Sequence, residues 1–195
     1  GNTIDNTGAG AIEAHNKTGM QIIDNTISNA GSGNGVFLYS GSALFGDKSV
    51  IEANTLTNAG IGVSGVSGTV IELNVIDGSP SASISIGAAA SNSRVINNVI
   101  TNSNQDGINI SGDNGAFSNW IFGNNISGTV IHDPPNFDIR AGGFAFHDNV
   151  GAENSADSTL GWDDIGTTGG TYPAGKNRFD FDNDGDVDVD DLAIL

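Results

Sequence analysis

The C-terminal residues 180–191 carry carboxylates at the spacing of a calcium-binding loop. With Asp180 as loop position one, carboxylates stand at positions one, three, five, nine and twelve, and Gly185 stands at position six, where such a loop turns sharply. Ca²⁺ binds about six to eight oxygen ligands, so a bound ion would offset the mutual repulsion of these side chains. We therefore predict a Ca²⁺ site formed by Asp180, Asp182, Asp184, Asp186, Asp188 and Asp191.

The predicted ligands would bind the ion in different ways. Asp186 would contribute its backbone carbonyl, Asp188 would bind directly or through a water molecule, and Asp191 would close the loop. Val187, at position eight, would anchor the loop through its apolar side chain. The segment Leu192-Ala193-Ile194-Leu195 then predicts the beginning of a helix.

A second group of titratable side chains lies between residues 132 and 140. His132, Asp133 and Arg140 bring an imidazole, a carboxylate and a guanidinium into one longer loop, and such loops often carry function. A polysaccharide lyase needs a base for the proton beside the uronate carboxyl and a cation or an arginine to neutralise that carboxyl. These residues are candidates for such a site, although we favour a wide turn without chemistry.

A third group consists of acidic side chains that recur along the chain. Asp24, Glu52 and Glu72 follow similar apolar pairs, so we expect them to stack on neighbouring strands about 5 Å apart. They could hold a second cation or form a hydrolase site with paired carboxylates. We favour a solvated acidic stripe, because like charges at this spacing repel each other.

Aromatic side chains offer one more kind of site. Phe37, Tyr39 and Trp120 are candidate stacking surfaces for a glycan, in a binding module without catalysis. We rank this function last, because several of these rings could equally belong to the core.

A repeat of about two dozen residues must position all of these side chains. The triplet Asn-x-Ile, or a close variant, begins at Asn2, Asn25, Asn54, Asn74, Asn98 and Asn124, with a decayed copy at Asp148-Asn149-Val150. We expect each Asn to occupy a tight left-handed corner and to bond through its amide to the Asn of the adjacent repeats. Turn-forming residues such as Asn58-Ala59-Gly60 separate the apolar segments.

Two further apolar columns lie inside each repeat. The second column alternates like a strand with one buried face, at Ile12/Ala14, Val36/Leu38, Ile61/Val63, Ile84/Ile86, Ile108/Ile110 and Ile139/Ala141. Its outward residues would be Glu13, Phe37, Gly62, Ser85, Asn109 and Arg140. The third column reads Ile22-Ile23, Val50-Ile51, Val70-Ile71, Val95-Ile96, Ile121-Phe122 and Ala145-Phe146.

Three short strands per repeat predict a coil whose equivalent strands pair in parallel and share one apolar interior. Over residues 1–150 the sequence thus resembles the right-handed parallel β-helix repeat family, the fold of pectate lyases, of alginate lyases and epimerases, and of many secreted bacterial proteins. The resemblance implies an all-β, right-handed parallel β-helix of about seven rungs and a place outside the cell or at its surface. Residues 151–179 would form a cap or linker.

Residues 180–195 resemble one calcium repeat of a dockerin, an EF-hand-type loop and helix. Asp191 stands where the EF-hand pattern has Glu, and the chain contains one such repeat where a dockerin normally has two. The resemblance implies Ca²⁺ as a cofactor and a cohesin-like protein as a candidate partner.

Charge narrows the choice of partners. The chain has 6 Lys and Arg against 23 Asp and Glu, a formal net charge of −17, which disfavours nucleic acid and anionic surfaces. No apolar run approaches the roughly 20 residues of a membrane span, so we expect no membrane insertion. We therefore predict a secreted calcium-binding β-helix protein with a structural, surface-binding or assembly role, including head-to-tail filaments. A polysaccharide lyase, epimerase or glycoside hydrolase, or a fragment of one, is the alternative.

Overall fold

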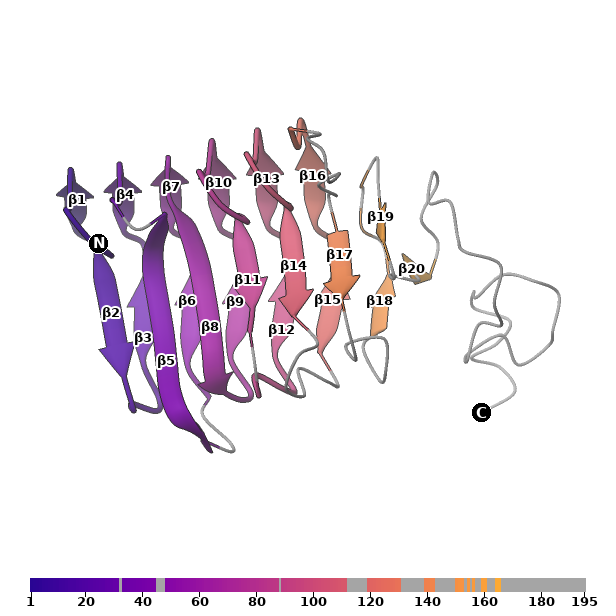
Figure 1. Ribbon diagram of the computed structural model, residues 1–195, viewed down its shortest axis with the longest axis horizontal. Coiled ribbons are helices and arrows are strands. Elements are labelled where there is room, and N and C mark those ends of the chain that lie inside the picture. The colour runs from indigo at the N-terminus through magenta and orange to yellow at the C-terminus, as the bar shows by residue number, and fades with distance from the viewer. Residues whose placement is uncertain are drawn as a thin grey trace, which may run out of the picture.

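The computed structural model is a parallel β-solenoid, in which the chain winds through three short strands per turn (Figure 1). It describes residues 1–31, 33–44, 48–87, 89–111, 119–130, 139–142, 150–152, 154, 156, 159–160 and 164–165. All regular elements of these residues are strands. Successive turns advance along one axis, from the N-terminus at the left of Figure 1 to β20 at the right. The predicted all-β parallel architecture is therefore confirmed.

Three sheets run along the solenoid, and each collects one strand from every turn. The first sheet contains β1 (Thr3–Asp5), β4 (Thr26–Ser28), β7 (Thr55–Thr57), β10 (Val75–Asp77), β13 (Val99–Thr101) and β16 (Asn125–Ser127). The second contains β2 (Ile12–His15), β5 (Asn34–Leu44), β8 (Gly60–Val66), β11 (Ile84–Ile86), β14 (Ile108–Ser111), β17 (Ile139–Gly142) and β19 (Thr159–Leu160). The third contains β3 (Gln21–Ile23), β6 (Val50–Glu52), β9 (Val70–Glu72), β12 (Arg94–Ile96), β15 (Trp120–Phe122), β18 (Val150–Ala152) and β20 (Asp164–Ile165).

Aliphatic side chains from the three sheets stack in the interior. In the first sheet Ile27, Leu56, Ile76 and Ile100 follow one another in register, each with no exposed surface. The second column of the sequence pairs as predicted, with Val36 beside Ile61 and Leu38 beside Val63. One turn could not bury these side chains alone, so the turns stabilise one another.

The third column departs from its predicted alignment at three places. Ile22 and Val70 are each out of the predicted register by one residue with the next strand, and Val150–Ala152 takes the place predicted for Ala145-Phe146. Ile22 pairs with Ile51, and Ile23 pairs with Glu52, whereas the sequence pattern had aligned Ile22 with Val50. Val50 and Val70 point outward and are half-buried, while Ile51 and Ile71 are fully buried. Because Val50 and Ile51 are both β-branched, the sequence allows either residue to point into the core. Only the packing of the strands decides between these two registers.

The decayed first-column copy at Asp148-Asn149-Val150 is also wrong. Val150 begins β18 and pairs with Trp120 of β15, so it belongs to the third sheet. The next residue in the row of asparagines is Asn154, which accepts a hydrogen bond from Asn124 Nδ2 at 2.7 Å.

A buried row of asparagines joins the turns at the corner before the first sheet. Asn74 is fully buried, and its Oδ1 accepts from the backbone N and the Nδ2 of Asn54, both at 3.0 Å. Asn74 Nδ2 in turn donates to Ile51 O at 2.9 Å and to Asn98 Oδ1 at 3.0 Å. The pattern repeats along the row, which we call the Asn ladder: Asn2, Asn25, Asn54, Asn74, Asn98, Asn124 and Asn154. The predicted ladder is confirmed.

The left-handed conformation lies one residue before the ladder and not at its asparagines. Positive φ angles occur at Asp24, Ala53, Leu73, Asn97 and Gly123, which precede five ladder residues. A second stack of positive φ angles follows the first sheet, at Asn6, Asn29, Asn58, Gly78, Asn102 and Gly128. The ladder asparagines therefore serve the hydrogen bonds of the corner, and their neighbours make the turn.

Some of the predicted organisation falls outside the described residues. Five turns, β1–β3 through β13–β15, have all three strands within the described residues. The seven-rung length, the cap or linker at 151–179 and the loop-helix at 180–195 remain predictions.

The Asn ladder predicts that the same substitution at two adjacent asparagines, Asn97 and Asn98, has very different effects on the free energy of unfolding. Asn98→Asp removes the amide donors to Ile71 O and Asn124 Oδ1 and places a charge against those acceptors. Because buried polar atoms lose their partners, we expect the free energy of unfolding to fall by at least about 3 kcal/mol. Urea denaturation followed by circular dichroism measures this change.

Asn97→Asp is the matched control, because Asn97 is exposed and Asp24 occupies the equivalent corner of an earlier turn. We expect its unfolding free energy to stay within about 0.5 kcal/mol of the parent protein. An equal loss of unfolding free energy in both variants would show that the hydrogen bonds of the Asn ladder do not stabilise the corner.

The backbone conformation of Leu73 predicts that a substitution at this position stabilises the protein. Its φ is +56°, a conformation that costs a branched residue about 1–2 kcal/mol, and the residue is 51% exposed, so little burial is at stake. We expect Leu73→Asn to raise the unfolding free energy by about 1 kcal/mol, because asparagine tolerates this conformation. The neighbouring Val75→Asn, on an exposed strand position without positive φ, should bring no gain in the same urea titration.

Candidate functional site

The outer face of the second sheet carries the side chains that best suit a ligand. Glu13, Phe37, Gly62, Ser85 and Asn109 lie in register along its outer side, as the sequence predicts, and the backbone of Arg140 continues the same row. A parallel column contains His15, Tyr39 and Ser64. Because the strands are parallel, each turn adds one residue to each column, and the face forms a strip along the solenoid axis.

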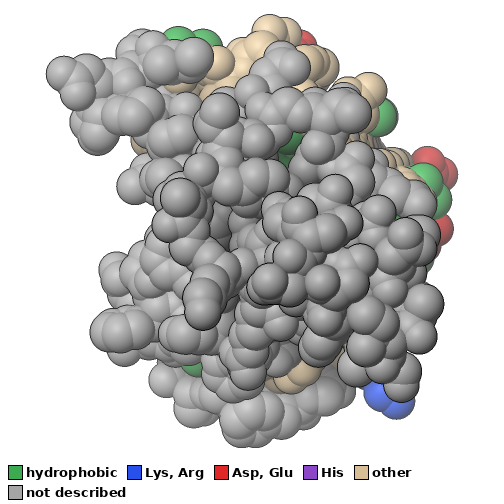
Figure 2. Space-filling model, turned by 90° about the vertical axis from the view of Figure 1, so that its right-hand side faces the viewer, with side chains coloured by type: hydrophobic (Ala, Val, Ile, Leu, Met, Phe, Trp, Pro, Cys, Tyr) green, Lys and Arg blue, Asp and Glu red, His purple; other side chains and the backbone are tan. Residues whose placement is uncertain are grey.

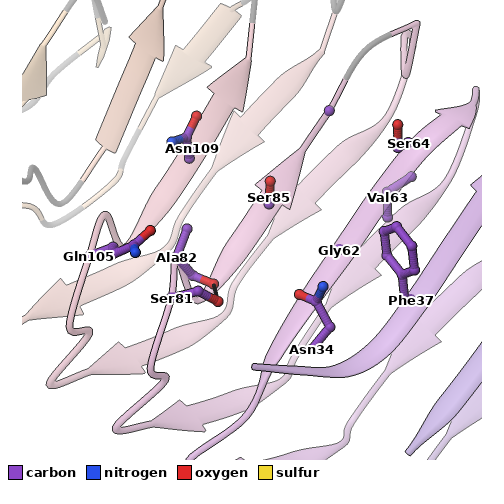
Figure 3. A pocket seen from close by; sticks show the side chains of 11 residues that line it. Asn34, Phe37, Gly62, Val63, Ser64, Ser81, Ala82, Ser85, Gln105 and Asn109 are labelled. Carbon is purple, nitrogen blue, oxygen red and sulfur yellow. Dashed lines mark hydrogen bonds between the residues drawn. The ribbon is translucent and has the colours of Figure 1, made fainter. Parts of the chain in front are cut away.

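A groove crosses this strip over β5, β8, β11 and β14 (Figure 3). Its volume is about 270 Å³, and its lining consists of amides, hydroxyls, small residues and one aromatic ring. The residues are Asn34, Phe37, Gly62, Val63, Ser64, Ser81, Ala82, Ser85, Gly87, Gln105 and Asn109. We call this site the second-sheet groove.

Two glycines keep the floor of the second-sheet groove low. A Cβ atom at Gly62 would lie 2.8 Å from Phe37 Cδ2 and 3.2 Å from Asn34 Oδ1, so the phenyl ring packs over the glycine. A Cβ atom at Gly87 would lie 3.2 Å from Ser64 Cβ and Oγ. Gly62 thus lets Phe37 lean toward the sheet as one wall of the groove, and the amides of Gln105 and Asn109 lie toward its other end.

Aromatic side chains continue from Phe37 toward the N-terminal turns. The rings of Phe37 and Tyr39 are stacked, with centroids 6.0 Å apart, and His15 meets Tyr39 edge-on at 5.6 Å. His15 Nε2 also lies 3.6 Å from Glu13 Oε2. His15 therefore extends an aromatic strip beside the groove.

Trp120 lies on a different face from Phe37 and Tyr39. It belongs to β15 in the third sheet, where the residue is 50% exposed and the Arg94 guanidinium lies 5.5 Å from the ring centroid. Phe122 lies beside it at 6.0 Å. The three predicted stacking residues therefore do not form one surface.

The expected acidic stripe is shorter than the sequence suggested. Glu52 and Glu72 pair in register on β6 and β9, but Ile23 occupies the equivalent position in β3. Asp24 lies one residue further, at the left-handed corner, where its backbone N donates to Glu52 O. Among the described residues, no three His, Asp or Glu side chains are grouped to hold a metal ion.

Two other carboxylates are bound by the next turn along the first sheet. Hydrogen bonds from the Ser28 hydroxyl and the Asn29 amide hold the pKa of Asp5 below its ordinary value of 3.8. Thr101 and Asn102 lower the pKa of Asp77 below 3.8 in the same way. Both carboxylates thus link adjacent turns and have no place in the groove.

The other predicted site residues are found mostly outside the described part of the chain. His132 and Asp133 lie outside the described residues, and Arg140 is placed only through its backbone, which pairs with Asn109. The six predicted calcium ligands, Asp180, Asp182, Asp184, Asp186, Asp188 and Asp191, also lie outside them. Figure 2 turns the C-terminal side toward the viewer, and described side chains are visible there mainly at the margin, acidic ones among them.

Sequence reasoning missed several lining residues of the groove. Asn34, Ser81 and Gln105 stand at or just before the beginnings of their strands, where a period of two no longer predicts side-chain direction. One usable signal was the small outward Gly62 between Phe37 and Ser85, since a glycine in a strand often marks a close approach.

Comparison with known proteins agrees with the architecture. The family described as "Right handed beta helix region" matches residues 1–154. No curated protein and no solved structure matches the chain. Of the described residues, none forms a helix long and apolar enough to cross a membrane.

Proposed function

The chain belongs to the right-handed β-helix family, and from this premise we propose that it is a secreted, calcium-binding protein that binds an extended glycan along its second sheet. The observation that carries the proposal is the second-sheet groove with its aromatic wall. The seven-rung rod, the C-terminal calcium loop and the extracellular location belong to the same proposal and rest on the sequence.

The chemistry of the lining suits sugar rings. Phe37 offers an apolar face to the C–H groups of a pyranose, while the hydroxyls of Ser64 and Ser85 and the amide of Asn109 can pair with sugar hydroxyls. Adjacent strands are about 4.8 Å apart, which is close to the length of one sugar residue in an extended glycan. An extended chain along the axis would therefore meet one turn of the solenoid with each sugar.

Binding is better supported than catalysis by the described lining. Its amides and hydroxyls neither take up nor release protons near neutral pH, whereas a lyase, epimerase or hydrolase needs a titrating base or acid. An enzyme would have to recruit titratable residues from outside this lining, such as Glu13 and His15 beside the groove, or His132 and Asp133, which lie outside the described residues. The enzyme alternative is therefore an outcome that the binding experiment must distinguish.

The calcium loop supplies the second part of the proposal. The acidic loop would be ordered by Ca²⁺, and an ordered loop and helix could dock to a cohesin-like protein or to the end of another rod. Head-to-tail self-association and cohesin-like docking are thus proposed as consequences of calcium binding.

Glycan binding can be measured by calorimetry with neutral and uronate oligosaccharides. We expect Phe37→Ala to weaken binding about tenfold, because the aromatic wall is lost, and Trp120→Ala, on the third sheet, to leave the affinity unchanged. Absence of binding to every glycan would refute this part of the proposal. Release of unsaturated ends or reducing sugars would favour the enzyme alternative.

Calcium binding can be measured on the same protein by calorimetric titration at fixed ionic strength. We expect one ion per chain, with binding abolished in Asp182→Ala and retained in Asp190→Ala, because Asp190 falls at loop position eleven, which is not a predicted ligand. Light scattering with and without chelator then reports self-association. Equal behaviour of the two variants would mean that the loop acts only as a charged tail.

A further inference from the structure

A buried carboxylate is hydrogen-bonded to one lining residue of the second-sheet groove. Asp106 is 3% exposed, and its Oδ2 accepts a hydrogen bond from Asn109 Nδ2 at 2.8 Å. Asn109 lines the groove from β14, beside Gln105 and Ser85 (Figure 3). Asp106 itself does not line the groove, so any effect on a ligand must pass through Asn109.

The carboxylate determines which end of the Asn109 amide the groove presents. An ionised carboxylate only accepts hydrogen bonds, so the NH₂ group of Asn109 must turn toward Asp106. The carbonyl oxygen Oδ1 is then left for the groove, where it can accept a hydrogen bond from a ligand. A hydroxyl group satisfies this acceptor, whereas an ionised carboxylate of a ligand cannot.

We propose that the Asp106–Asn109 pair makes the groove selective for neutral, hydroxyl-bearing glycans over uronate glycans. This inference rests on the proposed glycan-binding function and names the class of glycan. Asp106 is a positioning residue, and Asn109 is the group that meets the ligand.

Arg140 would favour uronate glycans, which is the opposite selectivity, so its effect must be considered together with that of Asp106 and Asn109. The Arg140 backbone pairs with that of Asn109, so Arg140 occupies the next register position along the same column. An arginine is the side chain best suited to a uronate carboxylate. The proposal therefore requires that the parent protein prefers neutral glycans with Arg140 in place.

The test uses probes that differ only in the oxidation of the sugar C6 atom: mannohexaose against hexameric mannuronate, and cellohexaose against hexameric glucuronate. We expect the parent protein to bind a neutral member at least about tenfold more tightly than its uronate counterpart. In Asp106→Asn the Asn109 amide can turn over, so the affinity for the neutral glycan should fall about five- to tenfold and the preference should shrink.

The reciprocal double variant Asp106→Asn/Asn109→Asp separates positioning from a general structural effect. The amide introduced at position 106 would donate to the carboxylate introduced at position 109, and the second oxygen of that carboxylate would again face the groove as an acceptor. We expect this variant to recover the affinity for the neutral glycan to within about threefold of the parent, while the single variant does not. Urea denaturation of each variant shows that the fold is intact.

The outcomes distinguish the two proposals. If the parent protein binds none of the four probes, glycan binding itself fails, and this inference fails with it. If the parent binds but Asp106→Asn has the same affinities, or if the parent prefers the uronates through Arg140, only the selectivity is overturned. Slow exchange of the Asn109 side-chain amide protons, lost in Asp106→Asn, would independently support the hydrogen bond in the absence of ligand.

Discussion

The Asn ladder is the constraint on which the rest of the solenoid depends. Each corner before the first sheet brings backbone groups into the interior, where water cannot satisfy them. Ladder side chains meet this need with a repeated set of bonds: the oxygen of Asn98 receives two donors from Asn74, and its amide donates to Ile71 O and to Asn124. A hydrophobic side chain of the same size would fill the space and leave those groups unpaired.

The Asn ladder also explains why the outer face of the second sheet can hold a binding site without weakening the core. Fixing one corner in every turn fixes the register of the strands that follow, so the outward residues of β5, β8, β11 and β14 fall into columns. The core needs only the inward positions of these strands. Outward positions can then combine an aromatic ring, glycines and amides without loss of packing, which is how Phe37 comes to lean over Gly62 beside the groove.

Much of the fold could be predicted from the sequence, because strand alternation and a recurring Asn are both visible in it. The second column and the ladder down to Asn124 are confirmed residue by residue. Errors arose where the pattern is degenerate: Val50-Ile51 fits two registers, and Asn149 resembled a ladder residue although Asn154 takes that place. The groove could be predicted only in part, because corner residues such as Asn34 and Gln105 turn toward it for reasons that no periodicity contains.

The spacing of the ladder shows how this architecture accommodates change. Consecutive ladder residues are separated by as few as 20 and as many as 30 positions, yet their amide bonds keep lengths between 2.7 and 3.0 Å. Extra residues are therefore absorbed between the strands while the interior keeps its geometry. A segment inserted beside the corner that precedes the second sheet could lengthen or reshape the groove wall independently of folding, which makes the rod a suitable scaffold for grafting new recognition loops.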